Sequence, residues 1–145
     1  MITAGRTLLS ERPDVWSFVA EPYNLPDWWP AYQAIRPDRR GLAEGARWTA
    51  TARAAKIGAI GILRRPVGDI TLELRRVVPG YELRWLDSWL GMEAGVALDN
   101  AGSGRTRATV FLDGSWWRGV LTGQNRLPTE AVGRLYDLCQ TAATA

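Results

Sequence analysis

The sequence contains no histidine, and this absence removes a large group of candidate chemistries. Ser–His and Cys–His nucleophilic catalysis, histidine general bases and histidine-bearing zinc sites are all excluded. Acid–base chemistry is left to aspartate, glutamate, tyrosine, Lys56 and ordered water. The single cysteine, Cys139, excludes an internal disulfide. It lies at helical spacing among Leu135, Tyr136 and Leu138, which favours a buried structural thiol over a reactive one.

Long apolar segments are also missing. No hydrophobic run approaches the ~18 residues that a membrane-spanning helix requires, and the N-terminus shows no basic region followed by an apolar stretch. We therefore expect a cytoplasmic protein without stable membrane insertion. The sequence has no phosphate loop, dinucleotide fingerprint or metal-ligand cluster, so we expect neither a metal nor a cofactor.

Lysine is nearly absent, because arginine supplies all but one of the 18 basic residues. The formal net charge is +3, but the arginines are scattered singly and in pairs rather than massed into a basic stripe. A nucleic-acid partner is therefore not expected. With 145 residues, 46% of them hydrophobic, no internal repeat and no obvious linker, we expect one globular domain over residues 1–145.

The N-terminal third predicts a strand followed by two short helices. Residues 2–9 favour a strand, Ser10 is a candidate N-cap and Pro13 suits a first helical turn. An apolar stripe over residues 15–19 supports a helix that ends by Pro22. The next segment, residues 23–30, is bracketed by prolines, has room for one helical turn and carries Trp28 and Trp29. Two interpretations stay open: this segment forms a lip of a cavity, or one tryptophan packs on the sheet and the other is half exposed.

Period-two alternation then predicts a run of strands. The expected strands span residues 32–36 (an edge), 46–53, 69–78, 81–89, 91–99 and 106–114. Pro79-Gly80 predicts a tight hairpin turn. Residues 56–66 fit a strand continuation, a flexible flap or a membrane-touching loop. An amphipathic helix is expected from Pro128 or Thr129 onward, and a further helical segment through Trp116 and Trp117 is weakened by nearby glycines.

This order of elements predicts an α+β fold, with a curved antiparallel sheet of about six or seven strands. Two short helices follow the first strand, and the long C-terminal helix is the element that covers the open face of the sheet. One helix cannot fill the whole concave face. We therefore expect an apolar cavity between sheet and helix.

Three segments resemble the START-like (SRPBCC) superfamily, in particular its polyketide cyclase/dehydrase type. They are Pro13-Asp14-Val15-Trp16-Ser17-Phe18-Val19, Asn24-Leu25-Pro26-Asp27-Trp28-Trp29-Pro30 and Val78-Pro79-Gly80-Tyr81-Glu82-Leu83. The resemblance spans nearly the whole chain and implies a helix-grip fold with an interior cavity that binds a lipid, sterol, polyketide or aromatic molecule. Its motifs are structural, so it transfers no catalytic residue.

Asp87 is the best candidate for chemistry. Strand alternation places Tyr81, Leu83, Trp85, Asp87 and Trp89 on one face. If this face points inward, desolvation raises the pKa of Asp87, and a protonated carboxyl can then donate a proton or orient a hydroxyl. In the alternative interpretation, Asp87 lies near the strand end and pairs with an arginine, while the tryptophans are ordinary core residues.

The residues expected to contact a ligand are aromatic, apart from one carboxyl: Trp28, Trp48, Tyr81, Trp85, Asp87, Trp89 and Tyr136. Tyr136 either places its hydroxyl in the cavity or is a satisfied core tyrosine. An exposed Trp116-Trp117 surface suggests a possible homodimer.

The preferred function is binding of a hydrophobic, cyclic or aromatic small molecule. The first alternative is a cofactor-independent cyclase or dehydratase that uses a carboxyl or tyrosine proton donor in the same cavity. The second is an interaction module that binds a protein or membrane through residues 56–66 or Trp116-Trp117.

Overall fold

A computed structural model describes residues 1–53, 69–114 and 124–144 of the chain. The elements follow in the order β1 (Ile2–Leu8), α1 (Arg12–Val19), η1 (Pro22–Asn24), α2 (Leu25–Trp28), β2 (Tyr32–Arg36), β3 (Arg47–Ala52), β4 (Asp69–Val78), β5 (Glu82–Asp87), β6 (Met92–Asn100), β7 (Thr106–Asp113), η3 (Gln124–Arg126) and α4 (Leu127–Thr144). The predictions for residues 56–66 and for Trp116 and Trp117 lie outside the described residues.

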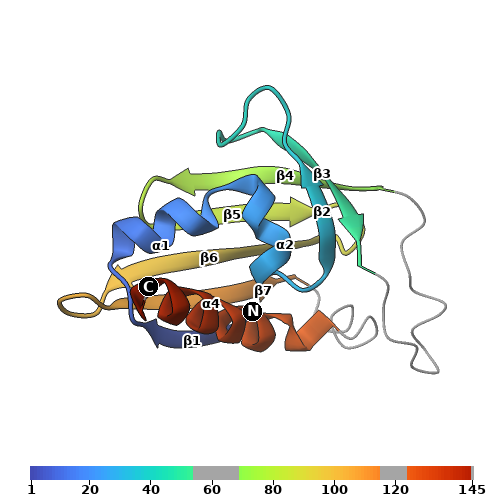
Figure 1. The fold of residues 1–145 in the computed structure, drawn as a ribbon. Helices are drawn as coiled ribbons and strands as arrows, with labels where there is room; N and C mark the ends of the chain where they lie inside the picture. Colours follow the sequence, from blue (N-terminus) through green and yellow to red (C-terminus); the bar gives the residue numbers. More distant parts are fainter. Residues whose placement is uncertain (54–68, 115–123, 145) are drawn as a thin grey trace.

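The strands form one seven-stranded antiparallel sheet in the order β1-β7-β6-β5-β4-β3-β2. The sheet is curved, and α1, α2 and α4 all lie against one of its faces (Figure 1), with α4 packed on β1 and β7. The predicted α+β fold is therefore confirmed, and β2 is an edge strand as expected. We call the face toward the helices the inner face.

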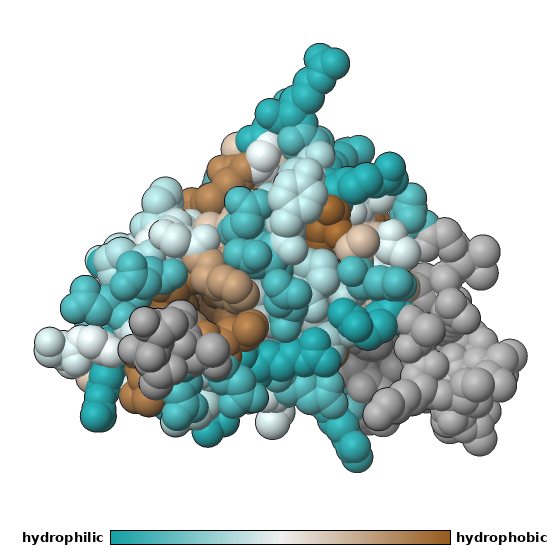
Figure 2. Space-filling view, viewed as in Figure 1, coloured by the Kyte–Doolittle hydropathy of each residue, from teal (hydrophilic) through white to brown (hydrophobic). Residues whose placement is uncertain are grey.

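Strand alternation separates a buried inner face from a more polar outer one. On β4, Ile70, Leu72 and Leu74 are buried while Thr71 is exposed. On β7, the inner positions are buried and apolar except for Thr106, whereas Arg107 and Thr109 lie on the outer face. The helix side of the molecule is mostly hydrophilic, with small hydrophobic patches, one of them beside α1 and the C-terminal end of α4 (Figure 2). This pattern is expected when the apolar side chains of sheet and helices are turned toward each other.

Local sequence signals set most of the element boundaries. Pro13 occupies the first turn of α1 as expected, and Gly80 has a φ of 85° in the predicted hairpin turn. The prediction that Ser10 caps α1 is wrong. The N-cap is Glu11, and the Ser10 hydroxyl instead donates to the backbone carbonyl of Cys139 at 3.2 Å, which ties the start of α1 to α4.

Cys139 itself is buried on α4, and burial raises the pKa of its thiol. A buried thiol with a raised pKa is mainly protonated near neutral pH and therefore a poor nucleophile. This confirms the expectation of a structural cysteine.

Gly95 on β6 lies on the outer face of the sheet, and its lack of a side chain lets neighbouring atoms pack closely against it. A Cβ at this position would overlap the backbone carbonyl oxygen of Leu83 and come within 2.6 Å of the Phe111 ring. We predict that Gly95→Ala lowers the free energy of unfolding by about 2 kcal/mol, because the carbonyl cannot move without breaking the pairing of β5 with β6. Denaturant unfolding measures this loss.

Gly133 on α4 provides a matched control for the same substitution. No atom lies within 4 Å of the position that its Cβ would take. Gly133→Ala should therefore raise the free energy of unfolding by about 0.5–1 kcal/mol, since alanine has the higher helix propensity. If both variants shift stability in the same direction, the steric explanation for Gly95 is wrong.

Candidate ligand-binding site

Four aromatic side chains and one carboxyl group meet on the inner face, and we call this group the aromatic cluster: Trp28, Trp29, Tyr32, Trp85 and Asp87. The first three come from one short stretch, with Trp28 at the end of α2, Trp29 as its C-cap and Tyr32 at the start of β2. Trp85 and Asp87 are alternate residues of β5 and therefore share its inner face. All five side chains are buried.

The rings pack edge to face around Trp85. The Trp85 ring centroid lies 6.0 Å from that of Trp28 and 5.3 Å from that of Trp29, with interplanar angles of 77° and 83°. Trp28 and Trp29 are also perpendicular to each other, with centroids 6.0 Å apart. Edge-to-face contacts at these distances contribute favourable quadrupole interactions beyond the burial of apolar surface.

Asp87 accepts three hydrogen bonds within this apolar environment. The Tyr32 hydroxyl donates to Asp87 Oδ2 at 2.6 Å, and the backbone N–H groups of Trp89 and Leu90 donate to Oδ1 at 2.9 and 3.0 Å. The Trp85 indole N–H donates in turn to the Tyr32 hydroxyl at 3.2 Å. The result is a chain of donors that runs from Trp85 through Tyr32 to the carboxyl group.

Burial dominates the electrostatics of this pair. It raises the pKa of Asp87 even though the hydrogen bonds from Tyr32, Leu90 and Trp89 act in the opposite direction. Burial also raises the pKa of Tyr32 well above its usual value, and the nearby Asp87 charge raises it further. Asp87 is thus a carboxyl group whose neutral form is favoured by desolvation, next to a hydroxyl that stays protonated.

The structure bears out part of each interpretation of Asp87. Asp87 is the last residue of β5 and Trp85 is a core residue, as the alternative expects. The expected pairing of Asp87 with an arginine is wrong, because its hydrogen-bond partners in the described chain are a tyrosine and two backbone N–H groups. The expectation of a buried carboxyl with a raised pKa beside tryptophans is confirmed. Such a group can orient a hydroxyl or carbonyl, or exchange a proton with it.

The hypothesis about Trp28 and Trp29 is corrected in a similar way. We considered a lip of a cavity, or one packed and one half-exposed ring. Both rings are in fact buried, with 0% and 1% of their surface exposed. The four-residue helix α2 and the turn after it direct both side chains toward the sheet.

Two further candidate residues, Trp48 and Trp89, contact the core but lie outside the aromatic cluster. Trp48 is buried on β3 and donates its indole N–H to the carbonyl of Gly41 at 2.7 Å. Trp89 is half-buried in the turn between β5 and β6 and packs against the core. Neither has a ring contact with the aromatic cluster among the described residues.

Tyr81 and Tyr136 lie outside the cluster. Tyr81 precedes β5 and is 46% exposed, with the Arg12 guanidinium 3.9 Å from its ring centroid. Strand alternation grouped it with Trp85, but it lies at the hairpin end of the sheet, where the core has ended. Tyr136 is half-buried on α4, and the Arg6 guanidinium of β1 lies 3.7 Å from its ring centroid. It packs against the edge of the core and makes no hydrogen bond to Asp87 among the described residues.

Sequence reasoning missed Tyr32, which makes the shortest hydrogen bond to Asp87. We expected this residue only as the start of an edge strand. Tyr32 and Asp87 are 55 positions apart, and no local pattern links them. Its aromatic character next to Trp28 and Trp29 was the only available signal.

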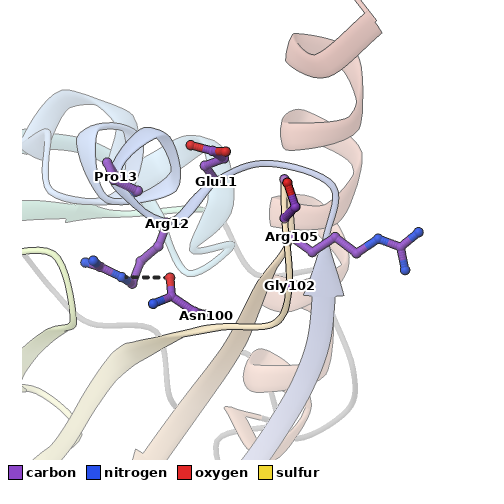
Figure 3. Close-up of a pocket in the computed structure, with 8 residues that line it drawn as sticks. Glu11, Arg12, Pro13, Asn100, Gly102 and Arg105 are labelled. Atoms are coloured by element: carbon purple, nitrogen blue, oxygen red, sulfur yellow. Dashed lines mark hydrogen bonds between the residues drawn. The ribbon is translucent and has the colours of Figure 1, made fainter.

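A separate polar pocket of about 180 Å³ lies between the start of α1 and the β6–β7 hairpin (Figure 3). It is lined by Glu11, Arg12, Pro13, Asn100, Gly102, Ser103, Gly104 and Arg105. Arg12 donates here to the Asn100 side chain at 3.2 Å and to the Gly80 carbonyl at 2.8 Å. The side chain of Arg105 points away from Arg12 in Figure 3. These contacts connect α1 to two hairpins and do not form a hydrophobic site.

The described residues contain neither a metal-ligand cluster nor a membrane-spanning helix. No group of three or more histidine, cysteine, aspartate or glutamate side chains there could hold a metal ion. No helix in that part of the chain is long and apolar enough to cross a bilayer.

The sheet, the two short helices after β1 and the long C-terminal helix define a helix-grip α+β fold. Solved structures with this fold include a di-domain ARO/CYC, StfQ, from the steffimycin biosynthetic pathway, with a TM-score of 0.69 and 13% identity. DynU16, from the dynemicin biosynthetic locus, has a TM-score of 0.62 and 19% identity. Ms6760 from Mycobacterium smegmatis has a TM-score of 0.69 and 16% identity.

These similarities cover 99%, 97% and 99% of the present chain, respectively. The chain spans about half of StfQ and DynU16, 46% and 47% of their lengths, but 91% of Ms6760. No family model matches the sequence. A comparison with curated proteins likewise gives no match. The similarities therefore establish the fold.

Proposed function

We propose that the chain binds a hydrophobic, cyclic or aromatic small molecule between the inner face of the sheet and α4. The observation that carries this proposal is the Tyr32–Asp87 pair, a polar group buried among aromatic rings that pack edge to face. Burying a carboxyl group is costly unless its hydrogen bonds are satisfied. A purely structural core position is usually apolar, so a polar pair at the centre of the aromatic cluster supports a role in recognition.

The physical basis of binding would be apolar burial combined with polar orientation. Removing apolar ligand surface from water contributes ~25 cal/mol per Å². The indole edges and faces of the aromatic cluster suit a planar ring system. Asp87 and Tyr32 would fix the orientation of a hydroxyl or carbonyl on that ring.

A second candidate function is a cyclase or dehydratase acting in the same place. Two observations favour it: the 2.6 Å contact between Tyr32 and Asp87, and the similarity in fold to StfQ, which is described as an ARO/CYC. An aldol cyclisation removes a proton from a methylene carbon, joins that carbon to a carbonyl carbon and protonates the carbonyl oxygen. A carboxyl with a raised pKa beside a tyrosine hydroxyl can carry out both proton transfers.

The chain is further proposed to be a single START-like domain over residues 1–145, of polyketide cyclase/dehydrase type and located in the cytoplasm. Trp48, Tyr81, Trp89 and Tyr136 stay in this proposal as possible outer contacts of a large ligand. Homodimer formation and the interaction module depend on residues outside the described chain and stay predictions.

Asp87→Asn tests the binding proposal with 1-naphthol as the probe. The amide keeps the shape of the carboxyl, but with its oxygen on the backbone N–H groups of Trp89 and Leu90 it places an NH₂ donor where Oδ2 accepts from Tyr32 and would accept from the naphthol hydroxyl. We predict 1:1 binding to the wild type by calorimetry and about tenfold weaker binding to Asp87→Asn, the effect of losing a hydrogen bond to a charged or buried group. The matched control is Asp113→Asn, at the outer-face end of β7, which should change the affinity less than twofold.

The outcomes separate the two candidate functions. No binding to the wild type would contradict the binding proposal, and equal binding to both variants would remove Asp87 from the site. For the enzymatic alternative, a linear diketo thioester is incubated with the wild type, Asp87→Asn and Tyr32→Phe. A cyclic dehydrated product formed by the wild type and lost in both variants would establish catalysis, and an unchanged thioester would argue against it.

A further inference from the structure

The indole N–H of Trp28 is buried and has no hydrogen-bond partner among the described residues. The neighbouring indoles differ in this respect. Trp85 donates to Tyr32, and Trp48 donates to the Gly41 carbonyl. A buried donor without an acceptor costs about 1–3 kcal/mol, and most buried donors in native proteins are paired. The Trp28 N–H is therefore open to an acceptor that the described residues do not supply.

Trp28 lies where the sheet, α2 and α4 meet. It is the last residue of α2, and α2 packs on both β2 and α4. Its ring contacts Trp85 on the inner face, and its side chain has 0% of its surface exposed. The unpartnered donor thus lies in the region between sheet and α4 that the proposed ligand would occupy.

We propose that the Trp28 N–H donates a hydrogen bond to an oxygen atom of the ligand, and that the ligand is an uncharged cyclic ketone or related carbonyl compound. This inference rests on the proposed function. The acceptor follows from the unpartnered N–H, which can only donate. The lack of charge follows from burial, because an anionic ligand would lose its hydration beside apolar rings and Asp87, whose hydrogen-bond partners among the described residues include no cation.

Two bicyclic compounds that differ by one carbonyl group test this proposal: 1-tetralone and tetralin. Affinities are measured by calorimetry for the wild type, Trp28→Phe and Trp48→Phe. We expect Trp28→Phe to weaken 1-tetralone binding about tenfold more than tetralin binding, because only the ketone loses a hydrogen bond. Trp48→Phe removes an equally buried indole whose N–H already has a protein acceptor. It should change the two affinities by the same factor.

An NMR measurement on the wild type makes the test independent of the stability of the variants. The indole ¹H–¹⁵N signal of Trp28 is assigned by its loss in Trp28→Phe. It should move downfield with 1-tetralone and much less with tetralin. If neither compound binds, the proposed function fails. Suppose instead that both compounds bind, that they shift the Trp28 signal equally, and that Trp28→Phe weakens both by the same factor. The proposed function then stands and the proposed role of Trp28 is overturned.

Discussion

Replacing Trp85 with alanine is expected to cause the largest loss of stability of any single substitution considered for this protein. Trp85 is fully buried at the centre of the aromatic cluster, where its ring contacts Trp28 and Trp29 and its N–H binds Tyr32. Truncation of a buried tryptophan creates a large cavity and costs about 3–5 kcal/mol. This is a large part of the 5–15 kcal/mol typical of a whole domain. Denaturant unfolding at neutral pH measures the loss.

Two further variants separate the contributions of Trp85. Trp85→Phe keeps most of the ring but removes the N–H, so it should cost about 1–3 kcal/mol through the smaller ring and the lost hydrogen bond. Trp89→Ala removes the same side chain from a half-buried turn position two residues beyond the end of β5 and should cost clearly less than Trp85→Ala. Equal losses for Trp85→Ala and Trp89→Ala would contradict a structural core centred on Trp85.

Replacing Tyr32 with phenylalanine is expected to cause the second largest effect, and this effect should depend on pH. The folded-state pKa of Asp87 is raised above its unfolded value. The folded protein therefore binds more protons than the unfolded chain between these two pKa values. Stability must fall as pH rises through that window. As far as Asp87 alone contributes, the wild type should therefore be most stable at a pH below the unfolded pKa of Asp87.

Tyr32→Phe enlarges this pH dependence. The Tyr32 hydrogen bond is the largest of the contacts that lower the Asp87 pKa against the effect of burial. Removing it raises the folded-state pKa further, so stability continues to fall up to a higher pH. At neutral pH we expect a loss of about 2–3 kcal/mol, as for a hydrogen bond to a charged group, and a smaller loss below the unfolded pKa of Asp87.

The measurement is a series of unfolding curves from acid to weakly alkaline pH, below the range in which tyrosine ionises. Asp87→Asn is the control, because it has no ionisable group at this position and should lack the Asp87 contribution in every buffer. If the difference between Tyr32→Phe and wild type is constant across this pH range, or if Asp87→Asn keeps the full pH dependence, Asp87 is not the group responsible.

The strands and helices could be predicted from sequence because their signals are local. Alternation defined β4 at its observed limits, and the Pro79-Gly80 turn set the β4–β5 hairpin. The start of α4 was expected within two residues of Leu127. The N-cap of α1 was predicted less reliably, because the Ser10 hydroxyl donates its hydrogen bond to a backbone carbonyl of α4 and does not cap α1.

The candidate site could be predicted only in part, because its geometry depends on long-range contacts. Alternation put Trp85 and Asp87 on the buried face of β5 correctly. It could not show that Tyr32 would be the partner of Asp87, because the edge strand and β5 are brought together only by the folded sheet. It also placed Tyr81 on the buried face wrongly, because periodicity does not show where a strand extends beyond the edge of the core.

The location of the bound ligand is the point on which the whole proposal depends. Chemical-shift mapping of methyl groups during a titration with 1-naphthol tests it without any mutation. We expect saturable shifts for Val96 and Val110 on the inner face and for Leu135 on α4, while Ala97 and Thr109 on the outer face stay unchanged. Shifts confined to the outer face, or none at all at saturating probe, would contradict binding between the sheet and α4.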